Sequence, residues 1–98
     1  MSKKLKSIFT DDLDRCIFTG STTVERHHVF GGPLREKSEK YGFIAPLHPT
    51  LHPNGVHFVP TLENKCIDTY LKQECQKWYE KNVGTREQWI KEFIRNYL

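Results

Sequence analysis

The chain has 98 residues, of which 37% are hydrophobic and 28% are charged, and its formal net charge at pH 7 is +3. This length and composition are those expected of one soluble globular domain. No apolar run approaches the roughly 18 residues of a membrane span, and the basic N-terminus lacks an apolar signal core. We therefore expect no membrane partner and a cytoplasmic location. The slight excess of positive charge is compatible with a nucleic-acid partner without requiring one.

Residues 1–14 form an N-terminal arm that begins with three lysines and then becomes acidic. Two interpretations are open: a frayed terminus, or a basic arm that lies along phosphate groups. Residues 15–18 are a strand-like segment, and the small turn residues at 19–21 end it.

A hairpin is expected next. Residues 22–30 (TTVERHHVF) alternate and are rich in β-branched and aromatic types, which predicts a strand that the Gly-Gly-Pro at 31–33 ends. The charged residues 34–42 predict a loop with about one helical turn, and residues 43–47 predict the second strand. Three prolines and an Asn-Gly pair within 48–60 predict a turn or one helical turn.

Two helices are expected after Pro60. Thr61 is the predicted N-cap of the first, which should end near residues 82–84. Thr85 and Gln88 match a capping box for the second, which should continue to the C-terminus. Both segments carry apolar and aromatic residues at three- and four-residue steps, so these stripes should form the core. We expect the helices to pack as an antiparallel pair and against the hairpin.

The three cysteines, Cys16, Cys66 and Cys75, are an odd number at spacings that match no disulfide framework. We expect reduced thiols. Cys66 and Cys75 fall within the first helical pattern, so we interpret both as packing residues.

The histidines are clustered within the middle third of the chain. All five lie between residues 25 and 59: His27, His28, His48, His52 and His57. On a strand, the adjacent His27 and His28 point to opposite faces. A doublet followed by further histidines from a second strand and turn is a pattern that metal sites use.

The segments ERHHVF, LHPTLH and GVH resemble the HNH family of ββα-metal nucleases. The segments HHVFGG, SEKYGF, GVHF and REQWIKEFIRNYL resemble small HNH-type proteins of phages and prophages. The resemblance implies an α+β fold with a ββα-metal hairpin core at residues 15–60. Two C-terminal helices, within 61–98, would pack against that core in a single domain, 1–98. It also implies a metal-dependent endonuclease that hydrolyses DNA phosphodiester bonds during phage DNA processing or recombination in a bacterial host cell.

Carried over by position, the resemblance implies His28 as the general base and His27, His52 and His57 as ligands of one divalent metal ion. A neutral imidazole can take a proton from water, because its unperturbed pKa is about 6.5. A divalent cation neutralises charge on the phosphate and assists the leaving oxygen. Magnesium, manganese, nickel and zinc are all compatible with this pattern. The role of His48 stays open.

Two features depart from the family pattern. Where many members carry two Cys-x-x-Cys pairs, this chain has CIFT at 16–19 and HPTL at 48–51, so we expect the structural zinc to be absent. The central Asn of the motif is also missing, since its neighbourhood is Gly42-Phe43-Ile44. Asn54 could substitute for it, although an Asn-Gly pair usually marks a turn.

DNA, double-stranded or branched, is the expected partner. The candidate phosphate contacts are Arg26, Arg35, Lys37 and Lys40. The alternative for the loop is a solvated charge cluster, because Glu36 and Glu39 balance much of its charge. No recognition helix is evident, so cleavage should be structure-directed or nonspecific.

Two other functions compete with the nuclease. The chain could be a catalytically inactive HNH-fold module that binds nucleic acid, as the missing Asn and the altered Cys pairs suggest. It could also be a small histidine-rich metal-binding interaction protein without a nucleic-acid partner. DNA binding that weakens steeply with salt would count against the latter.

Overall fold

The computed structural model describes residues 5–53 and 55–98. They form an α+β domain with a two-stranded antiparallel sheet and three helices, which confirms the α+β part of the expected fold. The elements in chain order are β1 (Glu25–His28), the 3₁₀ turn η1 (Gly32–Leu34), α1 (Arg35–Tyr41), β2 (Ile44–Leu47), the 3₁₀ turn η2 (Pro49–Leu51), α2 (Leu62–Asn82) and α3 (Arg86–Phe93). Among the described residues, no helix is both long and apolar enough to cross a membrane.

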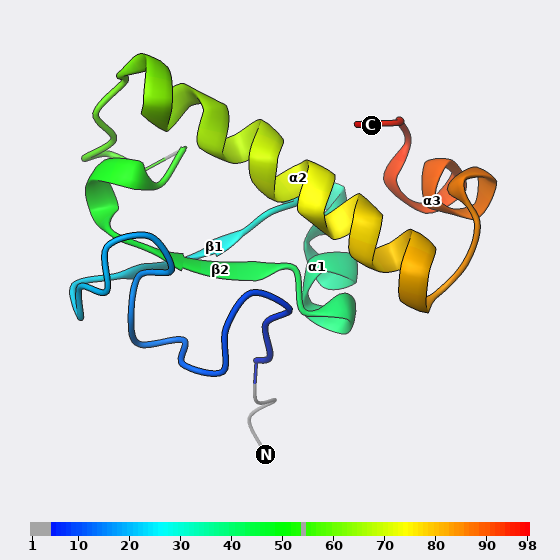
Figure 1. Ribbon diagram of the computed structural model, residues 1–98, viewed down its shortest axis with the longest axis horizontal. Helices are drawn as coiled ribbons and strands as arrows, with labels where there is room; N and C mark the ends of the chain where they lie inside the picture. The colour runs from blue at the N-terminus through cyan, green and yellow to red at the C-terminus, as the bar shows by residue number, and fades with distance from the viewer. Residues whose placement is uncertain (1–4, 54) are drawn as a thin grey trace.

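The hairpin lies between a long helix and an irregular segment. β1 pairs with β2 so that His27 lies opposite Ala45 and His28 opposite Ile44. Helix α2 crosses one side of this hairpin, and the N-terminal segment runs along the other (Figure 1). Helix α1 lies within the connection between the two strands. Every residue of β2 is buried, because both sides of the strand are covered.

The N-terminal segment covers the outer edge of β2 without forming a strand. Ser7 Oγ donates to the Ile44 carbonyl (2.6 Å) and the Ile17 amide donates to the Pro46 carbonyl (3.2 Å). The proline has no N–H to offer at this outer edge, so a regular third strand is disfavoured there. The strand predicted over 15–18 is therefore wrong. Ile8 and Phe9 of the predicted arm pack against the core, whereas its acidic residues are exposed. The first two lysines of the arm lie outside the described residues.

The charged segment between the strands is a seven-residue helix, α1, which is longer than the single helical turn predicted within a loop. Gly42 ends it in the left-handed region (φ 80°), and the Phe43 amide donates to the Ser38 carbonyl. Ser38 is fully buried, and its Oγ accepts from the Phe30 amide (3.0 Å) and donates to the Phe30 carbonyl (2.7 Å). Tertiary contacts therefore stabilise a helix whose full length the charged local sequence does not predict.

The predicted helix starts are confirmed. Thr61 caps α2 by accepting from the Asn64 amide (3.1 Å), and Thr85 with Gln88 forms a complete capping box on α3. Helix α3 ends earlier than predicted, at Phe93, because Ile94 adopts a positive φ of 79°.

The residues after α3 fold back onto the middle of α2. The buried Gln76 side chain donates to Asn96 Oδ1 (2.7 Å) and accepts from the Tyr97 amide (2.7 Å). The C-terminal end of the chain is consequently fixed beside α2 (Figure 1).

The predicted stripes of α2 and α3 supply the core only in part. Their buried members are Leu71, Cys75, Tyr79, Trp89 and Phe93, whereas Tyr70, Ile90 and Ile94 are exposed. Trp89 and Phe93 stack at 4.2 Å between ring centroids and meet Phe30 and Phe43 from the hairpin side. All three cysteines are free, as expected. Cys75 is buried, and burial raises the pKa of its thiol well above the ordinary value. Cys66 is exposed, so its prediction as a packing residue is wrong.

Candidate metal centre

The two adjacent histidines of β1 are divided between the two sides of the strand. His27 is 4% exposed and faces Asp68 of α2, whereas His28 faces Glu39 of α1. This division follows from the two-residue period of a strand. Both rings also line a single pocket of about 540 Å³ at the end of β1.

His27 carries a buried nitrogen that the surrounding protein leaves unsatisfied. Within the described part of the chain, its Nε2 has no hydrogen-bond partner. The Oδ1 atom of Asp68 lies 3.9 Å away, which is too long for a hydrogen bond. The ring of His52 stands edge-on to the His27 ring at 4.9 Å between centroids. A buried nitrogen without a partner is rare in a folded protein, and a bound ion or water is one way to satisfy it.

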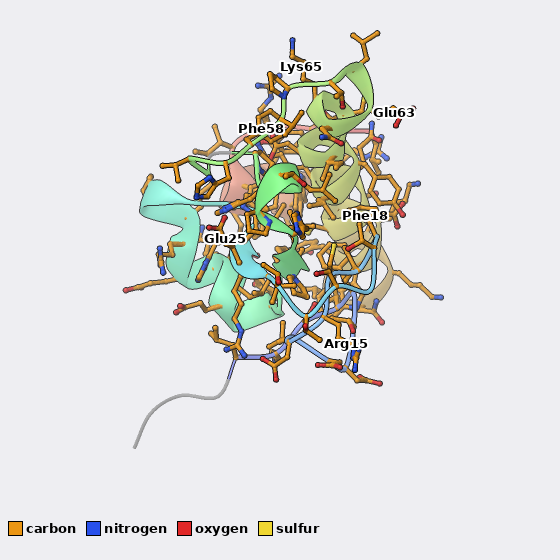
Figure 2. All side chains as sticks on the ribbon, turned by 90° about the vertical axis from the view of Figure 1, so that its left-hand side faces the viewer. Arg15, Phe18, Glu25, Phe58, Glu63 and Lys65 are labelled. Carbon is orange, nitrogen blue, oxygen red and sulfur yellow. The ribbon has the colours of Figure 1, made fainter. Side chains whose placement is uncertain are left out.

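A carboxylate orients the second imidazole. Nδ1 of His52, on the segment after η2, lies 2.6 Å from Oε1 of Glu25, the first residue of β1, which is labelled in Figure 2. This contact places the proton of a neutral ring on Nδ1 and leaves Nε2 with its lone pair. Metal-binding histidines commonly have such a carboxylate partner on their other nitrogen.

Asp68 supplies an ionised oxygen from α2. Its Oδ2 pairs with Lys72 Nζ one turn along the helix (2.8 Å), and Oδ1 faces His27. Burial raises the pKa of this carboxyl, but the nearby His27 ring and the Lys72 ammonium lower it by more, so the net pKa lies below the ordinary value. The group is therefore a carboxylate at neutral pH.

The three side chains are of chemical types that bind divalent metal ions. Two imidazoles and one carboxylate, His27, His52 and Asp68, are a ligand set that zinc, nickel and manganese accept. In the residues that the structure describes, no three such side chains stand close enough to ligate an ion together. Ligands about 2.1 Å from a tetrahedral ion are about 3.4 Å apart, so Asp68 Oδ1 and His27 Nε2 must approach by only a fraction of an ångström.

His28 has a carboxylate partner on the opposite side of the strand. Its Nε2 lies 3.1 Å from Oε1 of Glu39, and the side chain is only 10% exposed. His28 therefore lines the same pocket as His27, His52 and Asp68, although it lies on the other side of β1.

The predicted cations divide into two groups. Arg26 and Arg35 line the pocket, and Arg26 also pairs with Asp14 (3.0 Å). Lys37 donates to the Glu92 carbonyl (2.8 Å), and Lys40 lies over the ring of its neighbour Tyr41, so both are outside the pocket. Lys72, which was not among the predicted cations, also lines the pocket.

The structure does not bring every predicted residue to the site. His57 is exposed on the turn after η2 and does not line the pocket. His48 instead bonds Thr50 through Nδ1 (2.8 Å). Asn54, the possible substitute for the missing Asn, lies outside the described residues.

Cys16 and His48 come from the two degenerate Cys-x-x-Cys positions, and they lie together. Burial raises the pKa of the Cys16 thiol, but hydrogen bonds from the Thr19 side chain and from backbone groups, including that of His48, outweigh burial and lower it. A hydrogen bond to the His48 backbone therefore joins the turn at Cys16 to the start of η2.

Sequence reasoning missed four residues of the site: Glu25, Glu39, Asp68 and Lys72. The last two are one turn apart on a helix, a spacing typical of a surface ion pair, and nothing local relates them to histidines some 40 residues earlier. Comparisons of the chain with protein-family models, curated proteins and solved structures returned no match.

Proposed function

We propose that this protein is a metal-dependent endonuclease with an HNH-type centre that hydrolyses phosphodiester bonds in DNA. The observation that carries the proposal is the unpartnered Nε2 of buried His27, which faces Asp68 and the ring of His52 in a pocket that also contains His28. The hairpin with α2 packed across it agrees with the ββα-metal arrangement that the sequence resembles. A role in phage DNA processing or recombination rests on that resemblance alone.

His27, His52 and Asp68 would hold one divalent cation. When bound, the cation supplies charge neutralisation on the scissile phosphate and assistance to the leaving oxygen. The protein's own part is to fix the donors, and Glu25 does this for His52 through their 2.6 Å contact. This ligand set replaces His57, which is exposed, with Asp68, which faces His27.

His28 serves as the general base of the proposed reaction. Its side chain lines the pocket but is mostly shielded from solvent, so a water bound there could be deprotonated next to the substrate. His27 cannot share this role if its Nε2 binds the cation. The division of the doublet between two sides of β1 is what allows two separate functions.

Phosphate oxygens would contact Lys72 and Arg35 at the pocket wall. Lys72 is held by Asp68 and lies over the rings of Phe30 (5.9 Å) and Tyr97 (5.8 Å), so its ammonium is positioned before substrate binds. Contacts of this kind carry no base information, which agrees with nonspecific or structure-directed cleavage.

A second candidate is a nucleic-acid-binding module of the same fold without catalysis. It is favoured by the position of the missing Asn, where Phe43 and Ile44 are fully buried and offer no polar side chain. The same pocket cations would then bind phosphates with no cleavage.

The deciding experiment is incubation of metal-stripped protein with supercoiled plasmid, adding magnesium, manganese, nickel or zinc in turn. Metal-dependent nicking that EDTA abolishes, and that is lost in His28→Ala while metal binding remains, is the expected result. His57→Ala is the matched control and should retain cleavage. A folded protein that binds DNA but cleaves it with none of the four metals would exclude the nuclease in favour of the binding module.

A further inference from the structure

Glu39 lies where it can fix the ring of the proposed general base. Its Oε1 atom is 3.1 Å from Nε2 of His28. An ionised carboxylate only accepts hydrogen bonds, so this contact requires a proton on Nε2 of the neutral ring. The other ring nitrogen, Nδ1, then keeps its lone pair.

Buried contacts hold the helix of Glu39 against the strand of His28. The neighbouring Ser38 is fully buried, and its Oγ bonds both the amide and the carbonyl of Phe30, two residues after His28. Gly42 ends the helix immediately afterwards in the left-handed conformation. The Glu39 carboxylate is therefore held in position by the buried Ser38 before it and by the helix end at Gly42 after it.

We propose that Glu39 is a positioning residue that holds His28 in the Nε2-protonated tautomer and so presents Nδ1 as the base. This inference rests on the proposed function and assigns a role to a residue that the HNH resemblance did not indicate. Buried apolar residues occupy the position of the Asn in the HNH motif. The polar partner of His28 is Glu39, which belongs to α1.

In the proposed reaction, the oxygen of a water molecule forms a bond to phosphorus while the bond from phosphorus to the leaving sugar oxygen breaks. The water proton passes to Nδ1 of His28, and the leaving oxygen takes a proton from solvent. Glu39 stays ionised and keeps its hydrogen bond from Nε2–H, which stabilises the imidazolium. His28 then returns its proton to solvent.

The tautomer can be measured directly on the full chain by ¹⁵N NMR of histidine-labelled protein, without metal and without DNA. We expect the wild type to show His28 with a protonated Nε2 and a bare Nδ1. Glu39→Ala should give a mixture of tautomers, whereas Glu39→Gln should keep the Nε2–H form because its amide oxygen still accepts the hydrogen bond. Glu36→Gln, on the exposed side of the same helix, is the matched control and should leave the His28 signals unchanged.

Plasmid cleavage by the same variants tests the consequence for catalysis. Glu39→Ala should lower kcat on the order of 10- to 100-fold with little change in KM, because Glu39 acts through His28 and does not contact DNA. Glu39→Gln should lose less, and Glu36→Gln should match the wild type.

A protonated Nδ1 in the wild type, or His28 signals that Glu39→Ala leaves unchanged, would overturn the proposal. If Glu39→Ala does not fold, the wild-type spectrum and Glu39→Gln still decide it. A Glu39-dependent tautomer in a protein that cleaves DNA with none of the metals would support the positioning contact and refute the nuclease.

Discussion

Three histidines at the pocket differ in what their ring nitrogens contact. Glu25 accepts from His52, and Glu39 accepts from His28, while the buried Nε2 of His27 has no partner among the described residues. Leaving such a group unsatisfied costs about 1–3 kcal/mol. A ligand that binds this nitrogen would recover that free energy. The different contacts of the two rings therefore support His27 as the metal ligand and His28 as the general base.

Replacing Asp68 tests this site at the residue scale. Asp68→Asn preserves the shape of the side chain but removes the ionised oxygen that faces His27. We expect its affinity for zinc and manganese to fall on the order of 10-fold or more, measured by isothermal titration calorimetry of the metal-free protein.

Glu74→Gln is the matched control, because Glu74 is on the same helix but pairs with Lys77 away from the pocket. Equal metal affinity in Asp68→Asn and wild type would remove Asp68 from the ligand set.

At the scale of elements, helix ends were readable because capping depends on neighbouring residues. The Thr85 hydroxyl accepts from the Gln88 amide and the Gln88 side chain accepts from the Thr85 amide, which are contacts over three residues. Helix α1 is longer than the single predicted turn because buried contacts of Ser38 with Phe30, eight residues earlier, stabilise it.

Thr85→Ala should destabilise the domain by about 1 kcal/mol. The loss removes one half of the capping box of α3, whose Trp89 and Phe93 belong to the core. Urea unfolding followed by circular dichroism measures the change. Thr85→Ser should restore most of the stability because its hydroxyl can still accept from the Gln88 amide. An unchanged midpoint in Thr85→Ala would mean that packing alone fixes the start of α3.

At the scale of the whole molecule, one carboxylate joins the three helices. Tyr41 of α1 and Tyr79 of α2 both donate hydrogen bonds to the side chain of Glu92 on α3. Burial raises the pKa of both phenols, and Glu92 raises it further, to about 12 for Tyr41. Burial would raise the pKa of Glu92, but the two phenols and nearby lysines lower it by more.

The raised tyrosine pKa values predict a loss of stability in alkali. As the pH rises above 10.0, the ordinary pKa, the unfolded chain releases the Tyr41 proton while the folded protein retains it up to about 12. The free energy of unfolding should therefore decrease through this interval. Tyr41→Phe should reduce the slope, measured as Tm against pH, whereas the exposed Tyr70→Phe should keep it. Identical slopes in the two variants would contradict this assignment.

The local sequence determined the parts of this protein that depend on near neighbours: the period of the strand that separates His27 from His28, the caps of α2 and α3, and their apolar stripes. It also placed the histidines in one stretch, and this clustering predicts a metal centre. The tertiary structure alone decided which side chains meet. Packing of α2 across the hairpin brings Asp68 and Lys72 to His27, while the turn after η2 leaves His57 exposed. Contacts between residues some 40 positions apart leave no periodic trace in a single chain, because they depend on how the elements pack rather than on the residues within each element.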